Sequence, residues 1–155
     1  MHEASHPAYD SSDRADGSGH PAYDISDDKG RVDRDVVWQF LSTEAYWGRW
    51  RTRGDVMAQL DASWRVVGPY ERGTGAMVGF ARVLSDGVAL AYLADLFVLP
   101  DARGRGIGAG LVEAAMAPPG DRMRWMLHTG DAHGLYARFG FAPPDSTYLE
   151  RPRPE

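Results

Sequence analysis

The stretch LPDARGRGIGAGL, residues 99–111, decides the fold, and it lies between an apolar run and an amphipathic one. Several of its residues are glycines, whose missing Cβ lets the backbone turn tightly and approach a ligand closely. The unpaired amides at the start of the following helix carry partial positive charge, which suits phosphate or pyrophosphate. Two arginines in the stretch would add charge-assisted contacts to the same groups. The stretch therefore predicts a strand, an anion-binding turn and a helix in succession.

Other kinds of glycine turn fit this stretch less well. A P-loop needs a Lys followed by Ser or Thr at its end, and Gly108, Ala109 and Gly110 provide neither. The dinucleotide-binding pattern G-x-G-x-x-G is not met, because glycines stand at 108 and 110, so that fold is the weaker alternative. A glycine-rich turn without any ligand is the remaining alternative, and it would raise the entropy cost of folding without compensating contacts.

The segments on both sides of the stretch predict a βαβ unit. Residues 88–99 are long, apolar and strand-like, with a single carboxylate, Asp95, inside the run and Pro100 after it. Residues 107–117 place apolar side chains at helical spacing and stop at two prolines. Residues 124–129 predict the second strand of the unit.

The remaining elements complete one α/β sandwich. We expect an edge strand at 23–26, helices at 33–42, 53–62 and 132–139, strands at 63–70 and 76–84, and the start of a last strand at 141–142. We place this single domain at residues 22–150, with an N-terminal tail at 1–21 and a C-terminal tail at 151–155.

The N-terminal tail is rich in Ser, Asp, Gly, Pro and His and poor in aliphatic residues, which predicts disorder. Its segment HPAYDSSD, residues 6–13, recurs as HPAYDISD, residues 20–27, with Ile25 in place of Ser12. This is a short tandem duplication, and only its second copy runs into the domain. We therefore expect the second copy to supply the edge strand.

Composition narrows the class of protein. A chain of 155 residues has room for one ordinary domain, and its net charge of -5 gives no general attraction for nucleic acid. Because the chain has no cysteine, a thiolate metal site and a cysteine nucleophile are excluded, and we expect no metal. The sequence has no apolar run of about 20 residues and no signal-peptide pattern, so we expect a cytoplasmic protein without a membrane partner.

Two sequence blocks resemble a known family. Residues 103–108 read Arg-Gly-Arg-Gly-Ile-Gly and match the pattern Q/R-x-x-G-x-G/A, and the block LYARFGF follows at 135–141. With these blocks the chain resembles the GCN5-related N-acetyltransferase (GNAT) superfamily, and within it a bacterial subgroup of small, mostly uncharacterised members. The resemblance implies a GNAT-like α/β (α+β) sandwich. Its central sheet would be mixed but largely antiparallel and flanked by helices, with a splayed parallel strand pair that binds acyl-CoA.

The resemblance also implies acetyl-CoA as co-substrate. The pantetheine arm would pair with the strand edge, and the pyrophosphate would rest on the amides of the glycine turn. The cofactor-binding residues so implied are Leu96, Phe97, Val98, Arg103, Gly104, Arg105, Gly106, Ile107, Gly108 and Ala109. Thr129 stands where many members carry an Asn that helps to hold the cofactor, and its alternative role is to cap the next helix.

The implied reaction is direct attack of a neutral amine on the acetyl thioester. Tyr136 matches the general acid of the family, since a phenol is protonated at pH 7 and can donate to the departing sulfur; plain packing is its alternative role. Asp95 is the candidate base, because burial of a carboxylate in an apolar strand would raise its pKa. Its alternative role is an ion pair with an arginine such as Arg82.

The sequence says less about the amine that would accept the acetyl group. Tyr46 and Trp47 lie in an aromatic, arginine-rich linker that could form a wall for an amine or simply cover the core. His128 and His133 could orient substrate or relay a proton. We expect an N-acetyltransferase that acts on a primary amine of a small molecule. The alternatives are a non-catalytic acyl-CoA-binding module and an acetyltransferase for protein N-termini or lysines; the resemblance also implies that the chain can form a homodimer.

Overall fold

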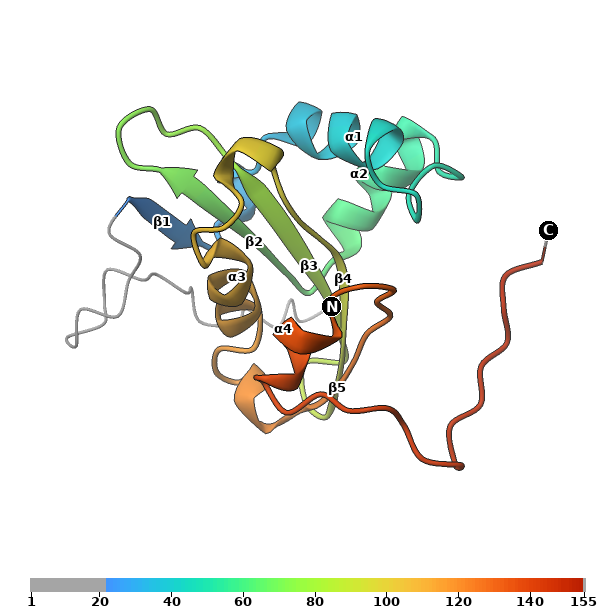
Figure 1. The fold of residues 1–155 in the computed structure, drawn as a ribbon. Helices are drawn as coiled ribbons and strands as arrows, with labels where there is room; N and C mark the ends of the chain where they lie inside the picture. Colours follow the sequence, from blue (N-terminus) through green and yellow to red (C-terminus); the bar gives the residue numbers. More distant parts are fainter. Residues whose placement is uncertain (1–21, 155) are drawn as a thin grey trace.

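Five strands form one sheet in the order β1-β2-β3-β4-β5, in a computed structural model that describes residues 22–154 (Figure 1). The strands are β1 (Tyr23–Ser26), β2 (Arg65–Glu71), β3 (Gly79–Ser85), β4 (Leu90–Val98) and β5 (Arg124–Met126). The α-helices are α1 (Arg34–Thr43), α2 (Arg53–Ala62), α3 (Ile107–Ala115) and α4 (His133–Ala137), with short 3-10 turns η2 (Lys29–Arg31), η3 (Pro100–Ala102) and η4 (Gly120–Arg122). The predicted tail at 1–21, with the first copy of the duplicated segment, lies outside the described residues.

The sheet is antiparallel from β1 to β4 and parallel between β4 and β5. The parallel ladder is short and ends at the pair Tyr92 and Met126, where β5 stops. Because β4 continues to Val98, the two strands form a fork beyond this last pair. The predicted mixed, largely antiparallel sheet with a splayed parallel pair is therefore confirmed.

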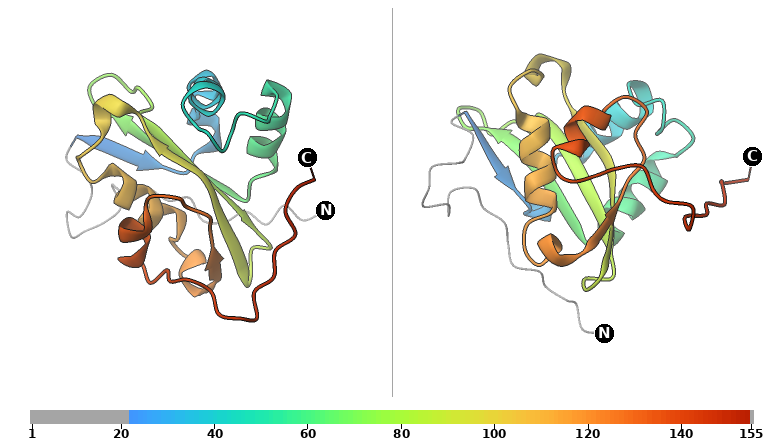
Figure 2. Two further views of the ribbon diagram at one scale, coloured as in Figure 1. Left: turned by 45° about the vertical axis from the view of Figure 1, so that its right-hand side comes forward. Right: turned by 60° about the horizontal axis from the view of Figure 1, so that its bottom comes forward.

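Helices cover both faces of the sheet and enclose two hydrophobic clusters. Figure 2 (left) shows α1 and α2 on one face and α3 and α4 on the other. The cluster under α3 contains Leu111 and Val112 together with Tyr23 and Ile25 of β1, so the second copy of the duplicated segment does supply a buried edge strand. The opposite cluster packs residues of α1 and α2, such as Leu41 and Leu60, against β2, β3 and β4.

Local signals in the sequence set the helix boundaries. The side chain of Asp33 accepts a hydrogen bond from the Val36 amide and begins α1. Thr52 and Asp55 form a capping box that begins α2. The predicted strand at 88–99 begins two residues later than expected, because Oδ1 of Asp86 accepts the amides of residues 88–90 and holds them in a turn.

Two expectations about the end of the chain are wrong. The predicted strand at 124–129 ends at Met126, where the backbone diverges from β4. No strand forms at 141–142 in the described part of the chain, because the Phe141 amide donates to the Tyr136 carbonyl and its ring packs edge-on against Tyr136 at 5.8 Å. The segment from 141 to 154 is therefore free of helix and strand and runs out along one side of the molecule, as Figure 1 shows.

A buried arginine fixes the end of α3. The Arg65 side chain is fully buried, and its guanidinium donates to the last carbonyls of the helix and of the turn after it, those of Ala114, Ala115, Ala117 and Pro118. Asp27, at the end of the duplicated segment, lies 3.7 Å from the same guanidinium. A cation at a helix C-terminus complements the helix dipole, so Arg65 ties α3 to β2 and holds the glycine turn at its other end in place.

Candidate active site

The glycine turn before α3 is shaped to receive a ligand. Gly104 and Gly106 both have φ of +77°, a left-handed conformation that residues with a Cβ rarely adopt. A Cβ built at either position would meet no atom within 4 Å, so the outer side of the turn is open. No side chain caps α3, so the amides of its first turn, at Ile107, Gly108 and Ala109, have no side-chain partner at this end of the helix. An open turn followed by an uncapped helix start is the local structure that anion binding requires.

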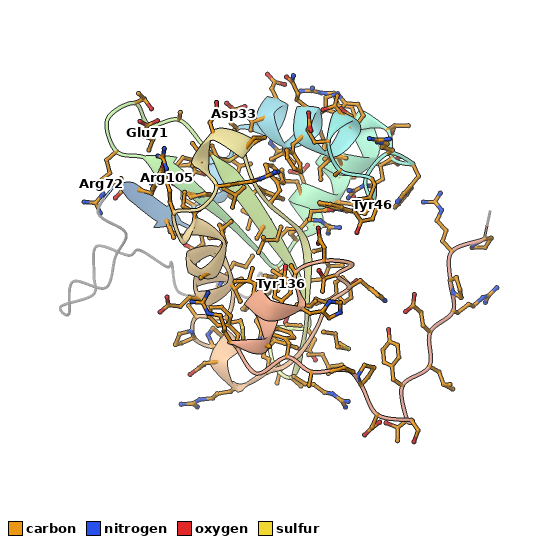
Figure 3. The ribbon with its side chains drawn as sticks, viewed as in Figure 1. Asp33, Tyr46, Glu71, Arg72, Arg105 and Tyr136 are labelled. Carbon is orange, nitrogen blue, oxygen red and sulfur yellow. The ribbon has the colours of Figure 1, made fainter. Side chains whose placement is uncertain are left out.

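The two arginines of the turn are held by defined contacts. Nε of Arg103 donates to the carbonyl of Val98 at 3.0 Å, which ties the turn to the end of β4. Nη1 of Arg105 donates to the Tyr23 hydroxyl at 2.7 Å, and Figure 3 shows Arg105 on the β1 side of the turn. Both cations therefore lie at the mouth of the turn, where they add positive charge to that of the helix start.

Beyond the last ladder pair, the edge of β4 faces the fork. Leu96 and Val98 are half-buried and pack toward the α3 cluster. Phe97 is different, because its ring stacks on Phe40 of α1 at 4.0 Å, on the opposite face of the sheet. The Phe97 side chain therefore lies away from the fork, and its predicted part in cofactor binding is limited to the backbone.

The fork leads into a cavity of about 480 Å³. Walls come from the α1–α2 loop, from β4 and from the segment between β5 and α4. Most of the predicted catalytic and substrate residues line it, together with Leu96 and Thr129 of the predicted cofactor set: Tyr46, Trp47, Asp95, Leu96, His128, Thr129 and Tyr136. In Figure 3, Tyr46 and Tyr136 come from these separate parts of the chain. His133 does not join them, because it is exposed at the start of α4 and does not line this cavity.

Tyr136 has the properties expected of a neutral acid. Its side chain is buried at the edge of the α3 cluster, and none of the described side chains hydrogen-bonds its hydroxyl. Burial, and to a lesser degree the charge of Asp131, raises the pKa of this phenol above its ordinary value. At physiological pH the hydroxyl therefore carries its proton and is free to donate it into the cavity.

Asp95 is the centre of a buried ion cluster rather than a free base. Arg51 donates two hydrogen bonds to its carboxylate, at 2.7 and 2.9 Å, and Nε of Arg82 donates a third at 2.7 Å. Nε1 of Trp47 donates a fourth at 3.1 Å. Burial raises the pKa of this carboxyl, but the hydrogen bonds and charges of the two arginines outweigh burial, and the net shift is downward. The expectation of a raised pKa is therefore wrong, and the alternative pairing with Arg82 is present.

Asp95 also adopts an unusual backbone conformation. The φ angle of Asp95 is +54°. On the neighbouring strand β3, the register of the pairing with β4 shifts between Phe80 and Arg82. A bulge of this kind re-aims a strand residue toward a site. Here it brings the carboxylate together with Arg51 from the α1–α2 loop and Arg82 from β3.

Thr129 binds the residue at which α4 begins but does not cap the helix, since Ala132 is the N-cap and no side chain caps α4. Its hydroxyl accepts a hydrogen bond from the Ala132 amide at 3.0 Å, just before α4. The hydroxyl therefore already has a backbone partner, although the residue also lines the cavity.

Three cavity or near-cavity residues were missed by sequence reasoning: Tyr92, Gln59 and Glu150. Gln59 supports the ion cluster by accepting a hydrogen bond from Arg51 at 2.8 Å. Tyr92 and Glu150 each form a hydrogen bond with a different ring nitrogen of His128. Tyr92 could have been found as a polar side chain in a run that otherwise looks apolar, whereas nothing in the sequence relates Glu150 to His128.

Metal sites and membrane spans were also sought in residues 22–154. No group of three or more His, Asp or Glu side chains in that range is arranged to hold a metal ion. None of the helices there combines the length and the hydropathy that a bilayer crossing requires.

A forked sheet beside an uncapped, glycine-rich helix start, with a buried phenol in the adjoining cavity, is the GNAT-like α/β arrangement that the sequence predicts. Comparison with known proteins agrees. Residues 66–143, just over half of the chain, match the family model described as "Acetyltransferase (GNAT) domain". The chain belongs to the GNAT acetyltransferase family.

Similar proteins support this assignment. A crystal structure from Xanthomonas campestris, described as a "putative acetyltransferase belonging to the gnat family", is 39% identical, with a TM-score of 0.80 over 88% of this chain and 96% of that one. A probable acetyltransferase from Staphylococcus aureus shares the fold at 19% identity, with a TM-score of 0.71 over 86% of this chain and 99% of that one.

The curated relatives are larger than the region they share with this chain. A "putative acetyltransferase" of Gibberella zeae is 30% identical over 116 residues, which are 70% of this chain and 61% of that protein. The mycothiol acetyltransferase of Acidothermus cellulolyticus is 39% identical over 69 residues, which are 43% of this chain and 21% of that protein.

Proposed function

We propose that this acetyltransferase uses acetyl-CoA to acetylate a primary amine of a small molecule. The observation that carries the proposal is the fork between β4 and β5, which opens beside the start of α3 and leads to the cavity that holds Tyr136. An extended pantetheine arm suits an open strand edge, since the edge offers amides and carbonyls for pairing. The pyrophosphate of the same molecule suits the uncapped helix start and the guanidinium groups of Arg103 and Arg105. A cytoplasmic location is part of this proposal, because acetyl-CoA is an intracellular metabolite.

The shape of the cavity favours a small acceptor. Tyr46, in the α1–α2 loop, reaches across to the segment before α4, and a Cβ built on Gly130 would stand only 2.9 Å from its hydroxyl. This contact forms a roof over a cavity of about 480 Å³, a size typical of small-molecule sites. A folded protein surface would have to displace the roof, whereas a small amine would not. The half-exposed ring of Trp47 lies on the same wall and suits contact with a cation or with an apolar chain.

The reaction proposed is a direct transfer. The nitrogen of the neutral amine attacks the acetyl carbon, the N–C bond forms and the C–S bond breaks, and Tyr136 donates its proton to the departing sulfur. We assign Asp95 a positioning role in place of the expected role as base. With all four hydrogen bonds in use, its carboxylate cannot accept a proton without releasing Arg51, Arg82 or Trp47.

Thiol release from acetyl-CoA in the presence of a panel of primary amines tests this function. The panel should include polyamines, amino acids, aminosugars and aromatic amines, with acetylated product identified by mass spectrometry. For the best acceptor we expect Tyr136→Phe to lower kcat by about 10²-fold while the affinity for acetyl-CoA is unchanged. Tyr70→Phe, which removes a buried hydroxyl outside the cavity lining, is the matched control and should retain activity. Full activity of Tyr136→Phe would contradict the assignment of the acid.

A further inference from the structure

Three hydrogen-bonded side chains lead from the cavity to the solvent. The Tyr92 hydroxyl lies 2.5 Å from Nδ1 of His128, and Nε2 of His128 lies 2.7 Å from Oε2 of Glu150. Tyr92 and His128 line the cavity. At the other end, the His128 and Glu150 side chains are 59% and 46% exposed. This row of side chains, Tyr92–His128–Glu150, therefore has one end in the acceptor site and the other in water.

The chemistry of the three groups fixes which atoms carry hydrogen. The hydrogen bond from His128, followed by that from Tyr148, lowers the pKa of the Glu150 carboxyl, so at neutral pH this group only accepts. A single hydrogen on the His128 ring would then lie on Nε2, facing the carboxylate, and leave the lone pair on Nδ1. Tyr92 is left as the donor to Nδ1, and the lone pairs of its oxygen are available to a donor in the cavity.

Tyr92 stands where the reacting groups would meet. Its pair with Met126 is the last one of the β4–β5 ladder, so Tyr92 marks the vertex of the fork. A pantetheine arm that starts at the helix turn beside Val98 and follows β4 must run toward this vertex. Its reactive end therefore arrives at the part of the cavity that Tyr92 and His128 line.

Given the proposed function, we infer that Tyr92, His128 and Glu150 form a proton relay that converts the bound ammonium group of the acceptor into the nucleophilic amine. The ammonium N–H bond breaks as its proton passes to the Tyr92 oxygen, while the Tyr92 proton passes to Nδ1 of His128. The imidazolium so formed is stabilised by the Glu150 carboxylate and discharges one proton to the solvent. As the N–C bond forms and the C–S bond breaks, the nitrogen loses a second proton, which returns to Tyr136 in place of the one that Tyr136 gives to sulfur.

Charged groups from every neighbouring element bear on the relay. On one side lie Arg82 of β3 and Asp95 of β4, and because Arg51 shares the same carboxylate, this cluster carries a net positive charge. Asp131 lines the same cavity from the segment before α4, and Tyr148 donates to Glu150 from the C-terminal segment. Burial, with the charges of Tyr148 and Glu150, raises the pKa of Tyr92. The Tyr92 oxygen therefore keeps its proton until the ammonium group of the acceptor supplies another.

Nuclear magnetic resonance of the His128 ring nitrogens tests where the hydrogens lie, and it needs no amine substrate. In the full chain at neutral pH we expect His128, assigned by loss of its signals in His128→Asn, to be the Nε2–H tautomer. The Nδ1 signal should move in Tyr92→Phe and the Nε2 signal in Glu150→Gln, whereas Tyr148→Phe should leave Nδ1 in place. An Nδ1–H tautomer, or no response to Tyr92→Phe, would overturn the relay.

Kinetics with the best primary amine of the panel tests whether the relay takes part in the reaction. Tyr92→Phe and Glu150→Gln should each lower kcat/KM at pH 7, the first by about 10²-fold, and the double variant should lose no more than the worse single one. The defect should shrink as the pH approaches about 10, where primary amines become neutral without help. A merely structural role would give a defect that does not change with pH, and that result, or full activity of Tyr92→Phe at pH 7, would overturn the relay. If the wild-type chain acetylates no amine, the proposed function has failed, and the tautomer of His128 still decides the relay geometry.

Discussion

Replacing Asp95 with alanine removes the only carboxylate from a buried cluster that contains two guanidinium groups. The side chains of Arg51 and Asp95 are 3% and 5% exposed, and that of Arg82 is 10% exposed. In the variant both cations would stay buried without their partner and would repel each other. Breaking a buried ion pair by removing one member typically costs about 3–5 kcal/mol. For a domain of this size we expect Asp95→Ala to lower Tm by roughly 10–20 °C.

Urea unfolding at pH 7 measures this free energy, and a surface ion pair provides the control. Arg34 and Asp61 are in contact at 2.5 Å but their side chains are 39% and 63% exposed, so Asp61→Ala should cost at most about 1 kcal/mol. A loss below about 1 kcal/mol for Asp95→Ala would refute the claim that this carboxylate holds the cluster together.

The difference in unfolding free energy between the wild-type chain and Asp95→Ala should also depend on pH, in a direction that the pKa shift of Asp95 fixes. The folded-state pKa of Asp95 is lowered, so its contribution is fully present above the unfolded-state value of about 3.9 and is lost as the pH falls through the folded-state pKa. The stability gap between the wild-type chain and Asp95→Ala should therefore narrow below about pH 4. A gap that stays constant down to pH 2 would mean that the folded-state pKa of Asp95 is not lowered.

Two further variants test the glycine turn and the anchor of α3. Ala109→Glu places a negative charge in the first turn of α3, which suits the helix dipole but repels a pyrophosphate. At about 5 Å this repulsion is roughly 1–3 kcal/mol, so the affinity for acetyl-CoA, measured by calorimetry, should fall by about 5- to 150-fold. Ala109→Gln is the uncharged control. Arg65→Ala removes the buried cation beside Asp27 and the donor to the last carbonyls of α3, and urea unfolding should show a loss of about 3–5 kcal/mol. Equal affinity in both Ala109 variants, or an Arg65→Ala chain as stable as the wild type, would contradict the respective assignment.

Much of the fold could be predicted because its signals are local. Asp33 begins the first helix and Thr52 the second, and the expected range 53–62 is the range of α2. Glycine at 104 and 106 is required by a backbone conformation that the sequence pattern implies directly. Local patterns also located the βαβ unit, since its strand, turn and helix follow each other along the chain.

The parts that could not be predicted depend on contacts between distant residues. Asp95 was recognised as a buried carboxylate, but the sign of its pKa shift depends on Arg51, 44 residues away, as well as on Arg82. The shortening of the predicted strand at 124–129 has a similar origin, because the backbone leaves β4 at Met126. His128 was selected as titratable, yet its role depends on Glu150, 22 residues later in a segment without regular structure.

Calorimetric titration of the full chain with acetyl-CoA tests the central claim most directly, because every proposed role depends on that ligand in the fork. We expect saturable one-to-one binding with a dissociation constant in the micromolar range, about -8 kcal/mol. We also expect acetyl-CoA to raise Tm, as a ligand of the folded state must. The absence of binding in a sample shown to be folded by its cooperative unfolding transition would contradict the account of the glycine turn, the fork and the cavity together.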